Sequence, residues 1–255
     1  MNPSSPIFIG IDPSGGRSPF NYAILDQDCS LQELRAGDVE DVLAIIRGQK
    51  AAIVAVNAPS SPNMGFVRTK MEKQARTASS HLRGLEMRLA EQILREHGIN
   101  LSPTPARKEL CPAWMQMGFA LYQELSKEGY EPYPAAETSR HWLETHPHAA
   151  FCTLLERVPL PKPTLEGRLQ RQSVLHTRGL EIKDPMDFFE EITRHKLLVG
   201  NLPMEFIYLP EELDALAAAY VAFLSGTQPD QVIAVGNEQE GRVVLPCNKL
   251  LDHYS

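Results

Sequence analysis

The sequence of 255 residues has few cysteines, no long apolar run and no excess of positive charge. Its four cysteines stand far apart and never as Cys-x-x-Cys, which argues against a disulfide framework and a zinc knuckle. The longest apolar stretch, residues 213–224, contains Asp214 and is shorter than the roughly 18–20 residues that cross a bilayer. The N-terminus lacks the charged start and the apolar core of a signal peptide. We therefore expect a cytoplasmic protein without a membrane partner.

The net charge of −7 argues against a protein that coats nucleic acid through bulk electrostatic attraction. The positive residues are nonetheless unevenly distributed. Residues 68–108 contain nine lysines and arginines against four glutamates, and a second basic stretch covers residues 157–178. Such stretches are typical of the solvated faces of amphipathic helices, and they also suit a surface that meets a polyanionic substrate.

Apolar residues make up 43% of the chain and charged residues 22%, which is typical of a globular protein with one large domain or two small ones. Residues 7–11 are continuously apolar, as in a strand buried on both faces, and shorter strands are expected at residues 21–25 and 31–35. A helix over residues 38–48 and a second apolar strand at residues 51–56 predict a parallel pair with a right-handed crossover.

The rest of the chain predicts further helices and strands around this centre. Helices are expected at residues 77–97, 112–129, 149–155, 165–175, 185–195 and 211–224. Strands are expected at residues 139–145, 231–235 and 242–245, of which the last two form a hairpin. Together these elements predict one α/β domain over residues 1–255, with a helical insertion at about residues 68–129.

Three carboxylates stand where an apolar element meets a turn. Asp12 ends the first strand, Glu144 lies in a later strand, and Asp214 lies near the start of the last long helix. In open α/β sheets, sites form beyond the carboxyl ends of the strands, so we expect the three side chains to converge. Neighbouring carboxylates repel unless a hard cation neutralises them, and two Mg²⁺ or Mn²⁺ ions there would activate water and bind a phosphate. Ordinary structural roles are also open to them, such as an Asx turn for Asp12 or a favourable helix-dipole contact for Asp214.

Six short motifs extend the argument over nearly the whole chain. They are GID at 10–12, VAVNAP at 54–59 followed by Arg68, ETHPHAAF at 144–151, KPTLEGRLQR at 162–171, LDALAAAY at 213–220 and the segment 241–246. In this order they resemble the family labelled domain of unknown function 429, a group of predicted nucleases with an RNase H-like fold. The resemblance implies a mixed sheet, with a three-strand meander and then parallel strands, flanked by helices.

The resemblance also implies roles for individual residues. Asp12, Glu144 and Asp214 match the family's acidic positions and are expected to be catalytic metal ligands. Asn57 stands where the family usually has an aspartate; its amide oxygen is a neutral ligand that adds no negative charge. Independently of the resemblance, the position of His146 close to Glu144 in the sequence leads us to expect that it supports the acidic cluster or donates a proton.

The favoured hypothesis is a Mg²⁺- or Mn²⁺-dependent hydrolase that cleaves a phosphodiester of nucleic acid. Guanidinium and ammonium groups suit phosphate oxygens. The expected phosphate contacts are Arg68, Lys162, Arg168 and Arg171.

Other readings of the same residues remain open. His141, His146 and His148 have a spacing that suits zinc, and Cys152 with His146 suits a cysteine hydrolase. The turn at residues 13–17 suits a phosphate cradle, as in an ATPase or kinase of the actin-like superfold. A non-catalytic RNase H-like domain that binds nucleic acid or protein is also consistent with Asn57.

Overall fold

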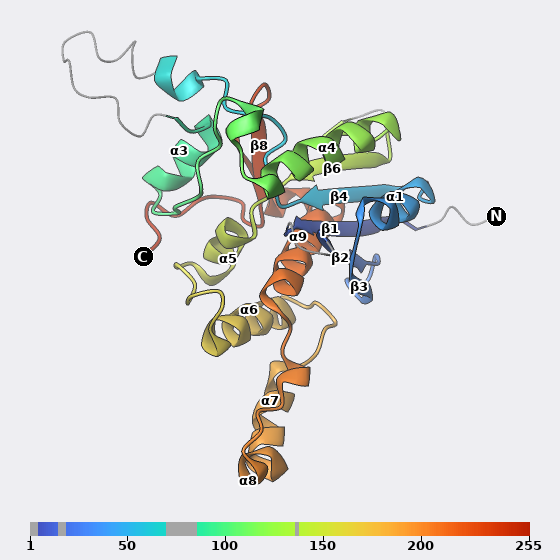
Figure 1. The fold of residues 1–255 in the computed structure, drawn as a ribbon, viewed down its shortest axis with the longest axis vertical. Helices are drawn as coiled ribbons and strands as arrows, with labels where there is room; N and C mark the ends of the chain where they lie inside the picture. The colour runs from blue at the N-terminus through green and yellow to red at the C-terminus, as the bar shows by residue number, and fades with distance from the viewer. Residues whose placement is uncertain (1–4, 15–18, 70–85, 136–137) are drawn as a thin grey trace.

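The computed structural model describes residues 5–14, 19–69, 86–135 and 138–255, and its centre is one mixed sheet of eight strands (Figure 1). The strand order is β3-β2-β1-β4-β6-β8-β7, and β5 pairs with β6 beside this path. The strands are β1 (Ile7–Pro13), β2 (Phe20–Leu25), β3 (Leu31–Gly37), β4 (Ala52–Val56), β5 (Glu131–Pro132), β6 (Arg140–Glu144), β7 (Ile233–Asn237) and β8 (Gly241–Leu245).

Two pairing patterns divide the sheet. Strands β1, β2 and β3 form an antiparallel meander, whereas β4 pairs parallel with β1, and β6 pairs parallel with β4. Helix α1 (Val39–Arg47) makes the crossover to β4 and begins at Asp38, which forms a capping box with Asp41. Because β1, β4 and β6 run the same way, their carboxyl ends meet at one edge of the sheet.

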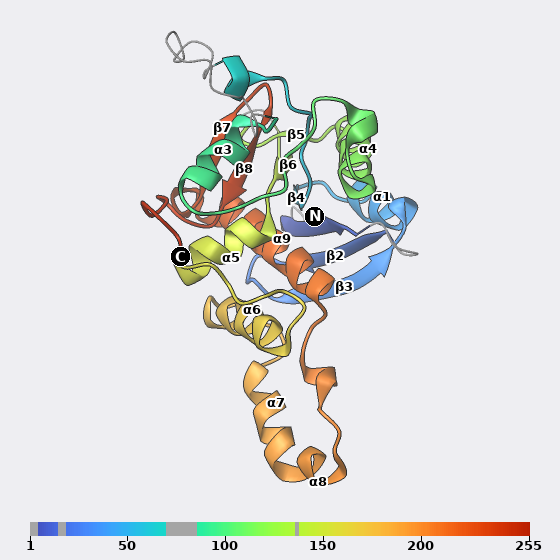
Figure 2. The same cartoon turned by 60° about the vertical axis from the view of Figure 1, so that its left-hand side comes forward.

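Helices cover both faces of the sheet (Figure 2). Further α-helices are α3 (Leu89–Glu96), α4 (Ala113–Lys127), α5 (Pro147–Leu155), α6 (Leu165–Thr177), α7 (Pro185–Glu191), α8 (Leu197–Val199) and α9 (Pro210–Thr227). The side chains of α1 and α4 pack with one face of β1 and β4, and those of α9 pack with the other face. Helices α7 and α8 extend away from the sheet as an arm.

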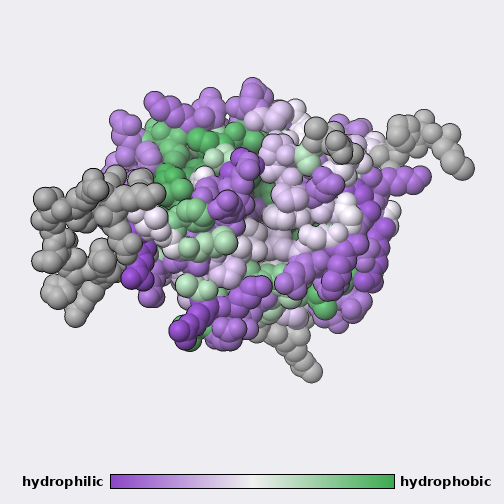
Figure 3. Space-filling model, turned by 90° about the horizontal axis from the view of Figure 1, so that it is seen from above, coloured by the Kyte–Doolittle hydropathy of each residue, from purple (hydrophilic) through white to green (hydrophobic). Residues whose placement is uncertain are grey.

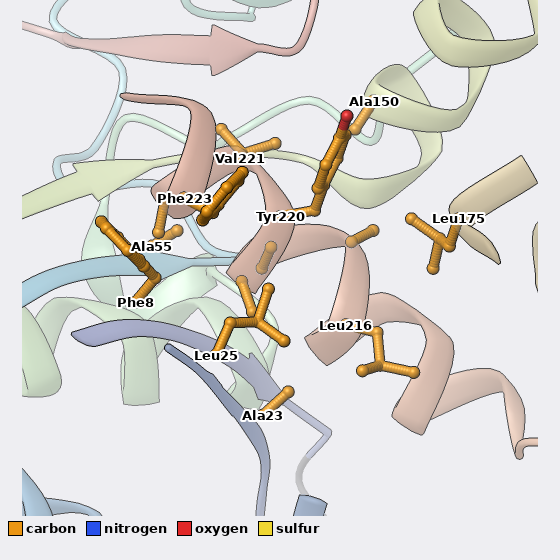
Figure 4. Close-up of a cluster of buried hydrophobic side chains, with 14 of the residues drawn as sticks. Phe8, Ala23, Leu25, Ala55, Ala150, Leu175, Leu216, Tyr220, Val221 and Phe223 are labelled. Atoms are coloured by element: carbon orange, nitrogen blue, oxygen red, sulfur yellow. The ribbon is translucent and has the colours of Figure 1, made fainter. Parts of the chain in front are cut away.

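Helix α9 is buried throughout its central part, from Leu213 to Ser225. Figure 4 shows its side chains among those of the sheet, with the Phe223 ring edge-on to Phe8 at 5.3 Å between ring centroids. The alanines of α9 allow a close approach of helix and sheet. At the closest point the backbone of α9 lies directly over Gly10 of β1.

Replacement of Gly10 by alanine is expected to lower the free energy of unfolding by about 2–3 kcal/mol. A Cβ atom there lies 2.1 Å from the carbonyl oxygen of Ala215 and 2.1 Å from the nitrogen of Ala219, both of which belong to the helix backbone. Urea denaturation checks this, with Gly48→Ala as control, because Gly48 has a helical φ of −72° and no neighbour closer than 3.6 Å. Equal midpoints for the two variants contradict the close packing of α9 on β1.

Most of the expected elements agree with the structure, including the terminal hairpin of β7 and β8. The helix expected over residues 77–97 is observed as α3 in its second half, and residues 77–85 lie outside the described part of the chain. The short β5 and the parallel pairing of β8 with β6 were not expected from the sequence. The four cysteines are free thiols, as expected.

No helix among the described residues has the length and apolar character needed to cross a membrane. The face of the molecule in Figure 3 mixes hydrophilic and hydrophobic residues.

Candidate functional site

Two of the three expected carboxylates meet at the carboxyl-end edge of the sheet. Asp12 is the second-last residue of β1, and Asp214 is the fifth residue of α9, the helix that crosses β1 at Gly10. Both are buried, with 4% and 7% of their surface exposed. Burial raises the pKa of Asp12 to about 7, and the nearby charge of Asp214 adds to the rise. Burial also raises the pKa of Asp214, although Lys162 opposes that shift.

Asn57 joins Asp12 from the neighbouring strand. It follows β4 directly, and its backbone N–H donates to the carbonyl oxygen of Ile11 at 2.8 Å. Its side-chain Nδ2 donates to Asp12 Oδ1 at 2.6 Å, whereas its Oδ1 is buried without a hydrogen-bond donor among the described residues. An unpaired buried carbonyl oxygen is costly, so this atom is available to a ligand.

Lys162 supplies the positive charge of the site. It lies in the proline-rich loop before α6, and its Nζ forms an ion pair with Asp214 Oδ2. Burial alone lowers the pKa of this ammonium group, but Asp214 and Asp12 outweigh burial and raise it. The Lys162 side chain keeps 38% of its surface exposed, which leaves it room to move toward a bound anion.

His146 lines the same site from the residue that caps α5. Burial, with smaller effects from the charges of His148 and Arg88, lowers the pKa of His146 to about 3. The imidazole is therefore neutral at physiological pH and carries no additional proton to donate. Its Nδ1 is buried without a partner in the described part of the chain.

These residues surround an open pocket of about 250 Å³. We call it the acidic pocket; its lining residues are Asp12, Pro13, Ser14, Asn57, Trp114, His146, Lys162, Glu211 and Asp214. Trp114 and Glu211 were not expected as site residues, because nothing in their local sequence indicates that α4 and α9 bring them to this edge.

Glu144, the third expected carboxylate, is not brought to Asp12 and Asp214. It pairs in register with Val56, which pairs with Ile11, so Glu144 lies level with Ile11. Side chains alternate between the faces of a strand, and Asp12 is one residue further along β1 than Ile11. Glu144 therefore points to the face covered by α4, and Asp12 to the face covered by α9.

On that face Glu144 belongs to a buried charged cluster centred on Arg88. The Arg88 guanidinium makes two hydrogen bonds to the Glu144 carboxylate, and its Nε donates to Glu91 Oε1 at 3.1 Å. The backbone N–H of Ser60 also donates to Glu144 at 2.8 Å. With its oxygens occupied in this way, Glu144 is satisfied by protein groups and needs no cation.

Of the four expected phosphate contacts, only Lys162 lines the acidic pocket. Arg168 donates to the carbonyl oxygens of Tyr208 and Ile207, at 2.7 and 3.0 Å. Arg171 is buried and donates to two carbonyl oxygens at 2.8 Å. Arg68 is exposed and is not part of the pocket lining. Arg168 and Arg171 therefore use their guanidinium groups to hold loops of the protein, and neither lines the acidic pocket.

The alternative sites find little support in the geometry. Among residues 5–14, 19–69, 86–135 and 138–255, no three or more His, Cys, Asp or Glu side chains are arranged to hold a metal ion, which includes the histidines considered for zinc. Burial raises the pKa of Cys152 to about 12, so its thiol is a poor nucleophile. Its sulfur lies 3.8 Å from His148 Nε2. Residues 15–17 of the expected phosphate-binding turn lie outside the described chain.

Fold and site together define an α/β protein with an acidic pocket at the carboxyl ends of its central parallel strands. The model of the family described as Protein of unknown function (DUF429) matches residues 10–239, and the chain belongs to this family. No curated protein and no solved structure matches the chain.

Proposed function

We propose that this protein is a divalent-metal-dependent phosphodiester hydrolase of the nuclease type, with the acidic pocket as its centre. One observation carries the proposal: two buried carboxylates, an unpaired amide oxygen and a lysine share one open pocket. The meander followed by parallel strands supports the further proposal that the fold is RNase H-like, as one domain with an insertion at about residues 68–129.

The donor atoms fit a single hard cation. Asp12, Asp214 and the Oδ1 of Asn57 are oxygen donors, the type that Mg²⁺ and Mn²⁺ prefer. Mg²⁺ is usually held by one or two carboxylates together with waters and substrate phosphates, so two carboxylates suffice. The raised pKa of Asp12 is what a carboxylate shows when it is buried beside another without a cation. Because Glu144 points to the other face of the sheet, two carboxylates remain at the acidic pocket, and we propose one metal ion there and not two.

When bound, such an ion supplies Lewis-acid polarisation of a phosphoryl oxygen and lowers the pKa of a coordinated water. Asp12, Asn57 and Asp214 are the residues that would hold it. Lys162, no longer needed to neutralise Asp214, binds a non-bridging phosphate oxygen through its ammonium group. Neutral His146 orients the substrate or a water by hydrogen bonding.

Asp214→Asn is expected to lower kcat/KM by about 100-fold or more and to abolish any rise in melting temperature caused by Mg²⁺ or Mn²⁺. The assay uses short single- and double-stranded DNA and RNA with each metal, beside an EDTA control. Asp230→Asn is the matched control, because Asp230 is exposed and is not one of the residues that line the pocket. Cleavage that persists in EDTA, or equal activity of the two variants, overturns the proposal. Metal-dependent binding without cleavage by the wild type identifies a binding domain instead.

A further inference from the structure

The acidic pocket has one aromatic wall, formed by Trp114. Trp114 is the second residue of α4, and its side chain packs against the cluster of Cys111, Met115 and Phe119 and against the apolar cluster between the sheet and helices α1 and α4. The residue is only half-buried. Part of a large planar ring is therefore presented in the same pocket as Asp12 and Lys162.

The second tryptophan of the chain provides a contrast. Trp142 packs against the Tyr122 ring at 4.7 Å between centroids. Trp114 packs beside Phe119 but forms no stacked or edge-on ring pair in the part of the chain that the structure describes. Among the described residues, therefore, no aromatic ring is stacked on the indole of Trp114.

We propose that Trp114 is a stacking platform for one base of the substrate. This inference rests on the proposed function and narrows the substrate to a phosphodiester that carries an unpaired base, such as a single-stranded nucleic acid or a dinucleotide. Bases stack on aromatic side chains irrespective of their identity, so the platform favours a base without selecting a sequence. A pocket of about 250 Å³ is smaller than the cavities that enclose drug-sized ligands, and it suits one phosphate with its adjoining nucleoside.

Different residues of the acidic pocket would bind the phosphate and the base of such a ligand. The phosphate meets Lys162 and the carboxylates, and the base meets the indole. In a duplex the same base is already stacked between its neighbours and must first be flipped out. We therefore expect single strands to be preferred over duplexes.

The direct test is tryptophan fluorescence in Trp142→Phe, in which Trp114 is the single indole. In the presence of Mg²⁺, adenosine 5′-monophosphate is expected to quench the emission, and ribose 5-phosphate is not. Trp114→Phe, which retains Trp142, shows no specific quenching, and circular dichroism confirms that both variants are folded. Equal responses to the two ligands overturn the inference. This readout requires no cleavage, so it remains informative if the proposed hydrolysis fails.

Kinetics provide the second test, with an oligonucleotide and its counterpart that is abasic at one position beside the cleaved bond. The wild type is expected to show a KM roughly ten-fold or more lower for the intact substrate, with similar kcat, because stacking acts equally in the ground and transition states. Trp114→Leu loses this preference and Trp114→Phe retains most of it. A preference that survives in Trp114→Leu assigns the tryptophan a packing role only. Failure of the wild type to cleave either substrate counts against the proposed function and not against stacking.

Discussion

In metal-free buffer at pH 8, Asp12→Asn is expected to be more stable than the wild type by on the order of 4 kcal/mol. The reason is that the pKa of Asp12 rises from 3.8 to about 7 on folding, and each pKa unit corresponds to about 1.36 kcal/mol. Above pH 7 the carboxylate of Asp12 is ionised in both states, so the wild type must bury a charged group beside Asp214 in order to fold. Asparagine avoids that cost and can still accept the hydrogen bond from Asn57.

The sign of the pH dependence follows from the same shift. Between about pH 4 and pH 7 the folded protein holds a proton on Asp12 that the unfolded chain has lost, so the wild type loses stability as the pH rises. Below about pH 4 both states are protonated and the advantage of the variant disappears. Denaturation in urea across this pH range measures the difference. A variant that is less stable than the wild type at pH 8 shows instead that the fold requires an ionised Asp12.

Addition of Mg²⁺ at pH 8 is expected to narrow the difference in stability between the two proteins. The wild type gains about 2.7 kcal/mol when the free metal is at 100 times its Kd, because the metal binds only the folded state. Asp12→Asn lacks one of the charged ligands and gains much less. Equal stabilisation of both proteins by Mg²⁺ places the metal outside the acidic pocket.

Arg88→Met is expected to destabilise the protein by about 3–5 kcal/mol, the usual cost of breaking a buried ion pair by removing one partner. Arg88 is 2% exposed, and its guanidinium donates hydrogen bonds to Glu144, to Glu91 and to the carbonyl oxygen of Glu240. Without the guanidinium, two buried carboxylates lose their counter-charge. The guanidinium also joins β6, α3 and the loop between β7 and β8, so its loss separates three parts of the fold.

Urea denaturation measures this effect, and Arg47→Met is the matched control. Arg47 forms an exposed ion pair with Glu128 at 2.8 Å, which solvent screens, so its removal is expected to change stability little. A second substitution, Glu144→Gln, in the Arg88→Met background is expected to recover part of the loss, because it removes one of the unpaired charges. Similar behaviour of Arg88→Met and Arg47→Met contradicts the cluster's contribution to stability.

Local apolar patterns in the sequence predicted the central strands, whereas the register of those strands was set by contacts between residues distant in the chain. The apolar runs at residues 7–11 and 51–56 predicted two buried parallel strands, and β1 and β4 confirm them. Because a buried parallel strand is apolar throughout, a polar residue at its end stands out. That signal placed Asp12 at the site edge, and the family resemblance added Asn57. In the structure, Asn57 Nδ2 lies 2.6 Å from Asp12 Oδ1.

Glu144 and Arg88 show where the local signal was insufficient. The sequence placed Glu144 in a strand, which is confirmed, but the face to which its side chain points depends on its register with Val56 and Ile11. A shift of one residue exchanges the two faces of a strand. Its counter-charge, Arg88, is 56 residues away along the chain.

The sequence by itself determined the order of the elements, the two buried parallel strands and the carboxylate at the end of the first, because these depend on local apolar runs and on residues next to them. Only the tertiary structure decided which charges meet. It brought Asp214 and Lys162 to Asp12, turned Glu144 to Arg88, and placed Trp114 at the acidic pocket. These contacts join segments far apart in the chain, and strand register and helix packing, which no local pattern encodes, set them.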